Sequence, residues 1–303
     1  MDSQRITCSP ISATRPLYWS VRRELWENRS IYIAPLAAAA VYLLGFLISL
    51  IWVPRSLREM AADHEPTPQL VALAMPYSHA AMLLVVTGLI VGVFYSLDAL
   101  HGERRDRSIL FWKSLPVSDL TTVLSKASIP LVVLPVLVFA ITVSLQLMML
   151  VLKLAAVVVS GVGTATPWAP PLFELEVVLL YTLAVHALWH APVYCWLLLV
   201  SGWARRATFL WAVLPPVAIG ALEYVAFHTS YFGSMLHDRL FGFAAGAFEL
   251  KDKSGVPIDP HFIPLAQLAP GRFLSSPGLW LGLVIAAAFF AAAVRLRRYQ
   301  GPI

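Results

Sequence analysis

Six apolar stretches, each long enough to cross a lipid bilayer, constrain this chain more than any other feature. They cover residues 31–53, 77–100, 127–152, 177–203, 207–227 and 278–294. Crossing about 30 Å of hydrocarbon takes roughly 20 residues of helix at about 1.5 Å per residue. A backbone inside hydrocarbon must bond within its own segment, and none of these stretches alternates as a barrel strand does. We therefore expect an all-α integral membrane protein, a single transmembrane domain over residues 1–303 with six transmembrane helices.

The distribution of charge follows the same pattern. Only 13% of the residues are charged, against roughly 25% in soluble domains. A net charge of +5 would suggest nucleic acid in a soluble protein, but 15 of the 22 lysines and arginines lie in the two tails and in the loops 101–126 and 204–206. Positive residues gather on the cytoplasmic side of a membrane. We expect both termini and these loops in the cytoplasm, outer loops at 54–76, 153–176 and 228–277, and no nucleic-acid partner.

The last outer loop, residues 228–277, is rich in turn-forming Gly, Pro and Asp. We expect it to be an extracytoplasmic cap with at most a short helix. Residues 1–30 predict a cytoplasmic tail and an amphipathic helix, because Leu17, Val21 and Leu25 repeat at helical spacing with aromatic residues beside them and arginines opposite. Such a helix is typical of the membrane interface, in contact with lipid. The alternative is an extension of the first span whose basic side chains reach the surface.

A charged island, residues 101–118 with the sequence HGERRDRSILFWKSLPVS, interrupts the apolar pattern between the second and third stretches. Glu103–Lys113 is long enough for about three turns of helix, and Ser118 suits the N-cap of the next span. A plain basic loop explains the arginines. The aromatic pair Phe111 and Trp112 beside mixed charges is typical of protein contacts and also of membrane interfaces, so composition leaves both interpretations open.

Several residues in and after the island form a signature that resembles a known family. They are Glu103-Arg104, Ser108, the run Leu115-Pro116-Val117-Ser118, and Lys126. The signature looks like the segment between the second and third spans of ABC-2 type transporter permeases, the membrane subunits of bacterial ABC exporters. In that family the segment is a coupling helix that docks on the nucleotide-binding subunit, and it often has a glycine or small residue where this chain has Arg107. The resemblance assigns ATPase coupling to Glu103, Arg104, Arg105, Asp106, Arg107, Ser108, Phe111, Trp112 and Pro116.

The resemblance also implies the function and the partners. The implied function is that of a permease subunit of an ATP-driven exporter in the bacterial cell (inner) membrane. Its implied partners are a second permease copy or homologue and cytoplasmic ABC ATPase subunits. No GxxxxGK[ST] phosphate loop occurs in the 303 residues. We therefore expect ATP and Mg to bind the partner ATPase, and this chain to bind no cofactor and to be no enzyme.

Polar residues inside the predicted spans leave other functions open. His186 and His190 lie four residues apart on one helix face, where two histidines can begin a metal site. No HExxH pattern supplies further ligands, so we favour packing histidines and expect no metal. Together with Glu223, the two histidines could also line a translocation path. An integral-membrane metalloenzyme using both histidines, and a membrane scaffold or sensor subunit, remain the alternatives to a transporter.

Overall fold

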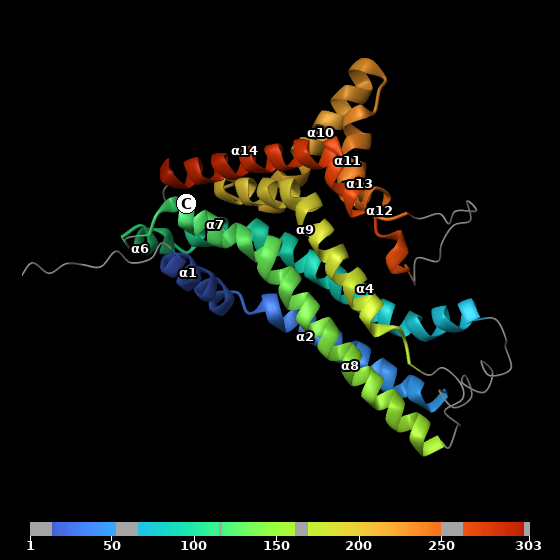
Figure 1. Ribbon diagram of the computed structural model, residues 1–303. Coiled ribbons are helices and arrows are strands. Elements are labelled where there is room, and N and C mark those ends of the chain that lie inside the picture. The colour runs from blue at the N-terminus through green and yellow to red at the C-terminus, as the bar shows by residue number, and fades with distance from the viewer. Residues whose placement is uncertain (1–13, 53–65, 115–116, 161–168, 250–262, 300–303) are drawn as a thin grey trace, which may run out of the picture.

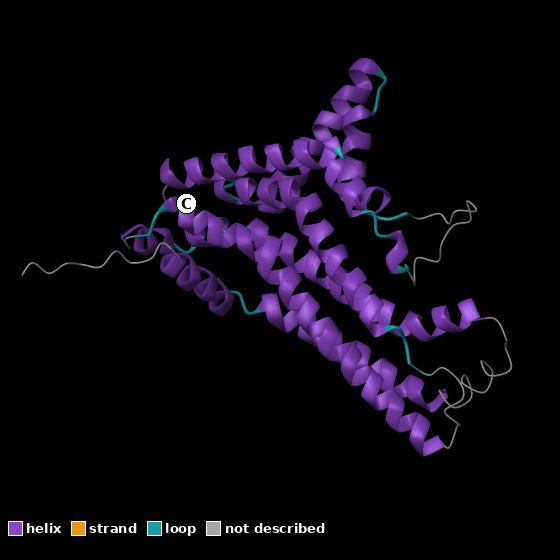
Figure 2. Cartoon of the chain, viewed as in Figure 1, coloured by secondary structure: helices purple, strands orange, loops and turns teal. Residues whose placement is uncertain are grey.

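The computed structural model describes residues 14–52, 66–114, 117–160, 169–249 and 263–299. Within these residues the chain consists of helices and connecting loops, with one isolated β-bridge between Phe248 and Leu268 (Figure 2). The elements are α1 (Thr14–Glu27), α2 (Ser30–Ser49), η1 (Leu50–Trp52), α4 (Pro66–Asp98), α5 (His101–Arg105), α6 (Ser108–Ser114), α7 (Asp119–Ser128), the π-helical turn η2 (Ile129–Val133), α8 (Leu134–Ser160), α9 (Leu172–Trp203), α10 (Thr208–Phe227), α11 (Tyr231–Phe241), α12 (Phe243–Ala247), η3 (Leu265–Gln267), α13 (Pro270–Ser275) and α14 (Pro277–Tyr299). Six helical segments are long and apolar enough to span a membrane. The chain is thus an all-α, multi-pass membrane protein, as predicted.

The six spans coincide with the six apolar stretches, but several helices run past the predicted ends. Helix α4 contains Pro76 in its interior, and α8 continues to Ser160. The predicted outer loops 54–76 and 153–176 are therefore too long. An apolar pattern marks the apolar part of a helix, whereas the helical hydrogen bonds continue into its polar ends. The hydroxyl of Tyr42 in α2 donates to the Pro76 carbonyl at 2.6 Å, which fixes α2 against this part of α4.

Helix α9 lies at the centre of the bundle, between α4 and α14, while α2 packs against α4 and α8 (Figure 1). The main core consists of apolar side chains from these helices, among them Ile31, Tyr77, Leu84, Met149 and Leu198. Many large apolar side chains on the outside of the spans are exposed. In water such a surface would favour aggregation, whereas in a bilayer it meets lipid.

The two ends of the bundle differ in composition. At one end α1, α5, α6, the start of α7 and the end of α14 come together (Figure 1). We call this the charged end. The opposite end, which we call the far end, carries α11, α12 and α13 and the start of α14. The first and last described helices meet at the charged end, as an even number of spans requires.

Helix α1 is formed as predicted and has two distinct faces. Val21 and Leu25 pack against the bundle core, with Glu24 buried beside them. On the other face Trp19 and Trp26 are exposed, and the guanidinium of Arg22 lies 5.1 and 4.7 Å from their ring centroids. The apolar stripe of the sequence therefore faces the protein, and the aromatic side chains lie on the exposed face.

The predicted cap, residues 228–277, contains more helix than the single short one expected. Helices α10 and α11 form a hairpin that turns at His228, whose φ of 50° is left-handed. The carboxylate of Glu223 in α10 accepts hydrogen bonds from the backbone N–H groups of Tyr231 and Phe232, each at 2.8 Å. These N–H groups have no partner within the first turn of α11, so Glu223 caps that helix. The expectation of at most a short helix was wrong, because the start of α11 is capped by a residue of the preceding span, outside the segment on which the expectation was based.

Candidate functional site

The charged island forms two short helices and not the single helix predicted over Glu103–Lys113. Helix α5 closes with a hydrogen bond of 2.9 Å from the Asp106 N–H to the Gly102 carbonyl. Arg107 then takes a left-handed conformation with a φ of 59°, and α6 starts at Ser108. A left-handed residue interrupts the helical hydrogen-bond ladder, and glycine adopts this conformation with the least strain. The permease family that the island resembles often has a small residue or glycine at this position.

The end of the island is described only in part. Pro116 lies outside the described residues, and of Trp112 only the backbone in α6 is described. Ser118 caps α7 as predicted, because its Oγ accepts the Thr121 N–H at 3.1 Å. Asp119 follows in the first turn, where a negative charge is favourable to the helix dipole.

Arg104 anchors the island to the end of α9. Its Nη1 donates to the carbonyls of Gly202 at 2.5 Å and Ala204 at 3.4 Å, and His101 Nδ1 lies 3.2 Å from the same Ala204 carbonyl. The last carbonyls of a helix lack partners inside the helix, and this end of the helix dipole is negative. A cation is favourable there for both reasons. Arg104 is accordingly buried and holds α5 against α9.

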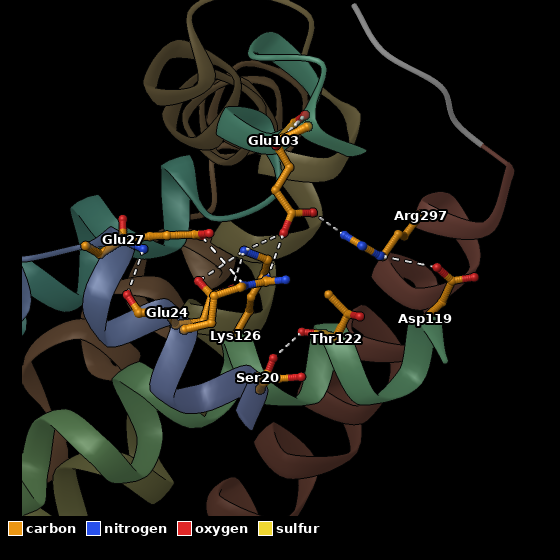
Figure 3. Close-up of polar contacts among 12 residues, drawn as sticks. Ser20, Glu24, Glu27, Glu103, Asp119, Thr122, Lys126 and Arg297 are labelled. Atoms are coloured by element: carbon orange, nitrogen blue, oxygen red, sulfur yellow. Dashed lines mark hydrogen bonds and ion pairs between the residues drawn. The ribbon is translucent and has the colours of Figure 1, made fainter. Parts of the chain in front are cut away.

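Glu103 lies in a group of buried and partly buried ions that joins α1, α5, α7 and α14 (Figure 3). Its carboxylate pairs with Lys126 Nζ at 3.1 Å and with the guanidinium of Arg297. Arg297 Nε also reaches Asp119 at 3.2 Å, and Lys126 Nζ bonds both oxygens of Glu24 at 2.9 and 3.1 Å. We call the following residues the ion cluster: Arg23, Glu24, Glu103, Asp119, Lys126 and Arg297.

The six residues of the ion cluster comprise three acidic and three basic side chains, and Glu27 lies at its edge, 3.7 Å from Arg23 Nε. Glu24 is 0% exposed and Lys126 is 2% exposed. Burial alone would raise the pKa of Glu24, but the positive charges of Lys126 and Arg23 and their hydrogen bonds outweigh it and lower this pKa. The hydroxyl of Tyr95 donates to the same carboxylate at 2.8 Å. Removal of one member would leave a buried charge uncompensated, so each member stabilises the contacts between these helices as long as its partners are present.

The opposite face of the island is exposed. Arg105, Asp106 and Arg107 lie at the surface, and Leu110 and Phe111 are 59% and 60% exposed. The predicted coupling residues therefore divide into two sets. Glu103 and Arg104 bind the bundle, whereas the exposed residues leave charged and apolar groups at the surface.

His186 and His190 lie side by side in α9, but Glu223 is bonded elsewhere. His186 Nε2 lies 3.3 Å from the Tyr194 hydroxyl, and His190 Nε2 lies 3.2 Å from the Leu240 carbonyl of α11. The two rings stack with centroids 4.0 Å apart, while Glu223 caps α11. Among the described residues, no group of three or more His, Cys, Asp or Glu side chains is placed to hold a metal ion.

Glu24 and Arg297 were not singled out from the sequence, although one signal for Glu24 was present. Glu24 falls seven residues after Leu17 and one before Leu25, hence on the same helix face as the apolar stripe. A carboxylate on a buried face needs a partner. The sequence gives no comparable sign for Arg297, which lies in a basic run at the end of the last span.

No protein-family model, curated protein or solved structure matches this chain. The class that the fold defines is that of six-span, all-α membrane proteins. The resemblance to ABC-2 type permeases rests on the residues of the island and on the order of the elements around it.

Proposed function

We propose that this chain is the membrane-spanning permease subunit of an ABC-2 type exporter, and that α5 and α6 dock on a separate ABC ATPase. The observation that carries the proposal is the two-sided island between the second and third spans. One face is exposed and mixes charges with Leu110 and Phe111, while Glu103 on the other face is bonded into the ion cluster. A surface of this composition suits a protein partner.

The proposed mechanism moves the helices through the island. ATP and Mg bind the partner, and closure of the ATPase displaces α5 and α6. Because α5 follows directly on α4 and is tied to α9 by Arg104, both spans take up this displacement. Glu103 passes it to α7 and α14 through Lys126 and Arg297. The chain thereby converts the binding and hydrolysis of ATP in its partner into a change of access across the membrane.

The proposed complex lies in a membrane with a defined orientation and contains a second permease subunit. The basic residues near the charged end favour a cytoplasmic position for it, in the inner membrane of a bacterium, with both termini on that side. The exposed aromatic face of α1, with Arg22 over Trp19 and Trp26, suits the membrane–water interface. A second permease copy or homologue completes the proposed assembly, as in the family that the island resembles.

Affinity purification from native membranes tests the proposal. The tagged chain should retain an ATPase that carries a phosphate-loop motif. Replacing Leu110 and Phe111 together by alanine should lower the yield of that ATPase at least about tenfold, which corresponds to about 1.4 kcal/mol. Phe173→Ala is the matched control, because Phe173 is an exposed aromatic residue at the start of α9, away from the island. Retention of the ATPase by the double variant, or absence of any such ATPase from the wild type, would contradict the proposal.

A further inference from the structure

Helix α14 is held by an arginine side chain at each of its ends. At the charged end its own Arg297 donates to Glu103 of α5 and to Asp119 of α7. At the far end Arg239 of α11 donates from Nη2 to the Gly278 carbonyl at 2.8 Å. The same helix is therefore bonded to the island and to the α10–α11 hairpin.

The contact at the far end is a close one. The Arg239 guanidinium lies 4.5 Å from the ring centroid of Trp189 in α9, and its Nη1 donates to the Trp189 carbonyl at 3.3 Å. It also occupies the space above Gly282, where a side-chain Cβ would collide with it. Arg239 thus joins α11, α9 and α14 in one place, and a cation over an indole ring adds to the attraction.

Between these contacts α14 is built to stay straight. No glycine or proline follows Gly282 in the helix, and kinks occur mostly at such residues. Its 23 residues extend over about 34 Å at about 1.5 Å per residue. Ala286 and Ala293 are buried, and α14 packs along α9, its main neighbour. When one end of α14 is displaced, the helix should therefore move as one unit and displace its other end as well.

We infer that α14 transmits movement of the island to helix α11 at the far end, with Arg297 and Arg239 as the positioning residues at the two contacts. The inference rests on the proposed function only in taking the island as the place where force enters. The physical link itself is a property of this chain alone. It is expected to appear as energetic coupling between the two ends, whether or not an ATPase is bound.

Hydrogen exchange of the purified chain in lipid nanodiscs tests the link. Arg297→Gln should speed the exchange of the backbone amides of residues 231–241 at least about fivefold, the lower end of typical coupling between sites. Arg298→Gln, an exposed neighbour on the same helix, should leave these amides unchanged. Asp119→Asn weakens the same contact from its partner's side and should give a smaller increase, which keeps the test informative if Arg297→Gln does not fold.

The double variant Arg239→Gln with Arg297→Gln should exchange at residues 231–241 no faster than Arg239→Gln alone, because the link is already cut. If Arg297→Gln accelerates exchange in α5 and α7 but leaves residues 231–241 at the wild-type rate, the inference is wrong. That outcome is distinct from failure of the proposed function. The latter is read from ATPase copurification and does not alter exchange in the isolated chain.

Discussion

Two buried lysines on the third span have opposite surroundings. Lys126 at the charged end is 2% exposed and pairs with Glu24 and Glu103. Lys153, toward the C-terminal end of α8, is 7% exposed, and its ammonium has no hydrogen bond or ion pair with any residue that the structure describes. A paired buried charge fixes the arrangement of the helices around it, whereas an isolated one only costs free energy. Lys126 therefore ties α7 to α1 and α5, whereas Lys153 makes no such contact with another described residue.

Removing the ion pairs of Lys126 should change the stability of the protein more than any other substitution considered below. Lys126→Met should lower the free energy of unfolding by about 3–5 kcal/mol, because Glu24 and Glu103 lose their shared counterion inside the bundle. Thermal or denaturant unfolding in detergent measures it. A loss of unfolding free energy below about 1 kcal/mol would show that the ion cluster does not hold these helices together.

Replacing Lys153 by methionine should change the free energy of unfolding in the opposite direction. Lys153→Met removes a buried charge without a partner among the described residues, and we expect it to raise the free energy of unfolding by about 1–3 kcal/mol. The two variants control for each other, since both exchange a buried lysine for methionine in one span. Destabilisation of Lys153→Met as large as that of Lys126→Met would remove the contrast.

Acid should weaken the charged end through Glu24. The pKa of Glu24 is lowered in the folded protein from a usual value of 4.5, so its contribution is fully present above about pH 4.5 and is lost as the pH falls through the lowered pKa. Stability measured from pH 7 down to pH 3 should therefore drop at the acidic end. In Glu24→Gln the acid-dependent part of the loss should be smaller. Equal acid dependence in both proteins would mean that Glu24 carries none of it.

The smallest expected effect concerns the break between α5 and α6. Arg107 is left-handed, and glycine relieves a strain of about 1 kcal/mol at such a position. Arg107→Gly should therefore raise the free energy of unfolding slightly, whereas Arg105→Gly, in the right-handed turn before it, should lower it. A decrease in both variants would indicate that the break is not set by the left-handed residue.

The sequence predicted the membrane spans better than the contacts and breaks that connect them. Length and apolar content identify a span, and the cap by Ser118 follows from a local rule, so both predictions were confirmed. The break at Arg107 was missed because arginine has no special preference for a left-handed conformation. The ion cluster joins Glu24, Glu103 and Arg297 across more than 270 residues of chain. Helical spacing shows which face a residue lies on, but not which distant helix faces it.

Photo-crosslinking in native membranes tests whether the exposed face of the island binds an ATPase. A photoreactive amino acid replaces Leu110, or replaces Val159 at the opposite end of the third span as a control; both positions are exposed. We expect position 110 to capture a protein with a phosphate-loop ATPase motif and position 159 not to capture one. Capture of no such ATPase at position 110, or equal capture at both positions, would contradict this expectation.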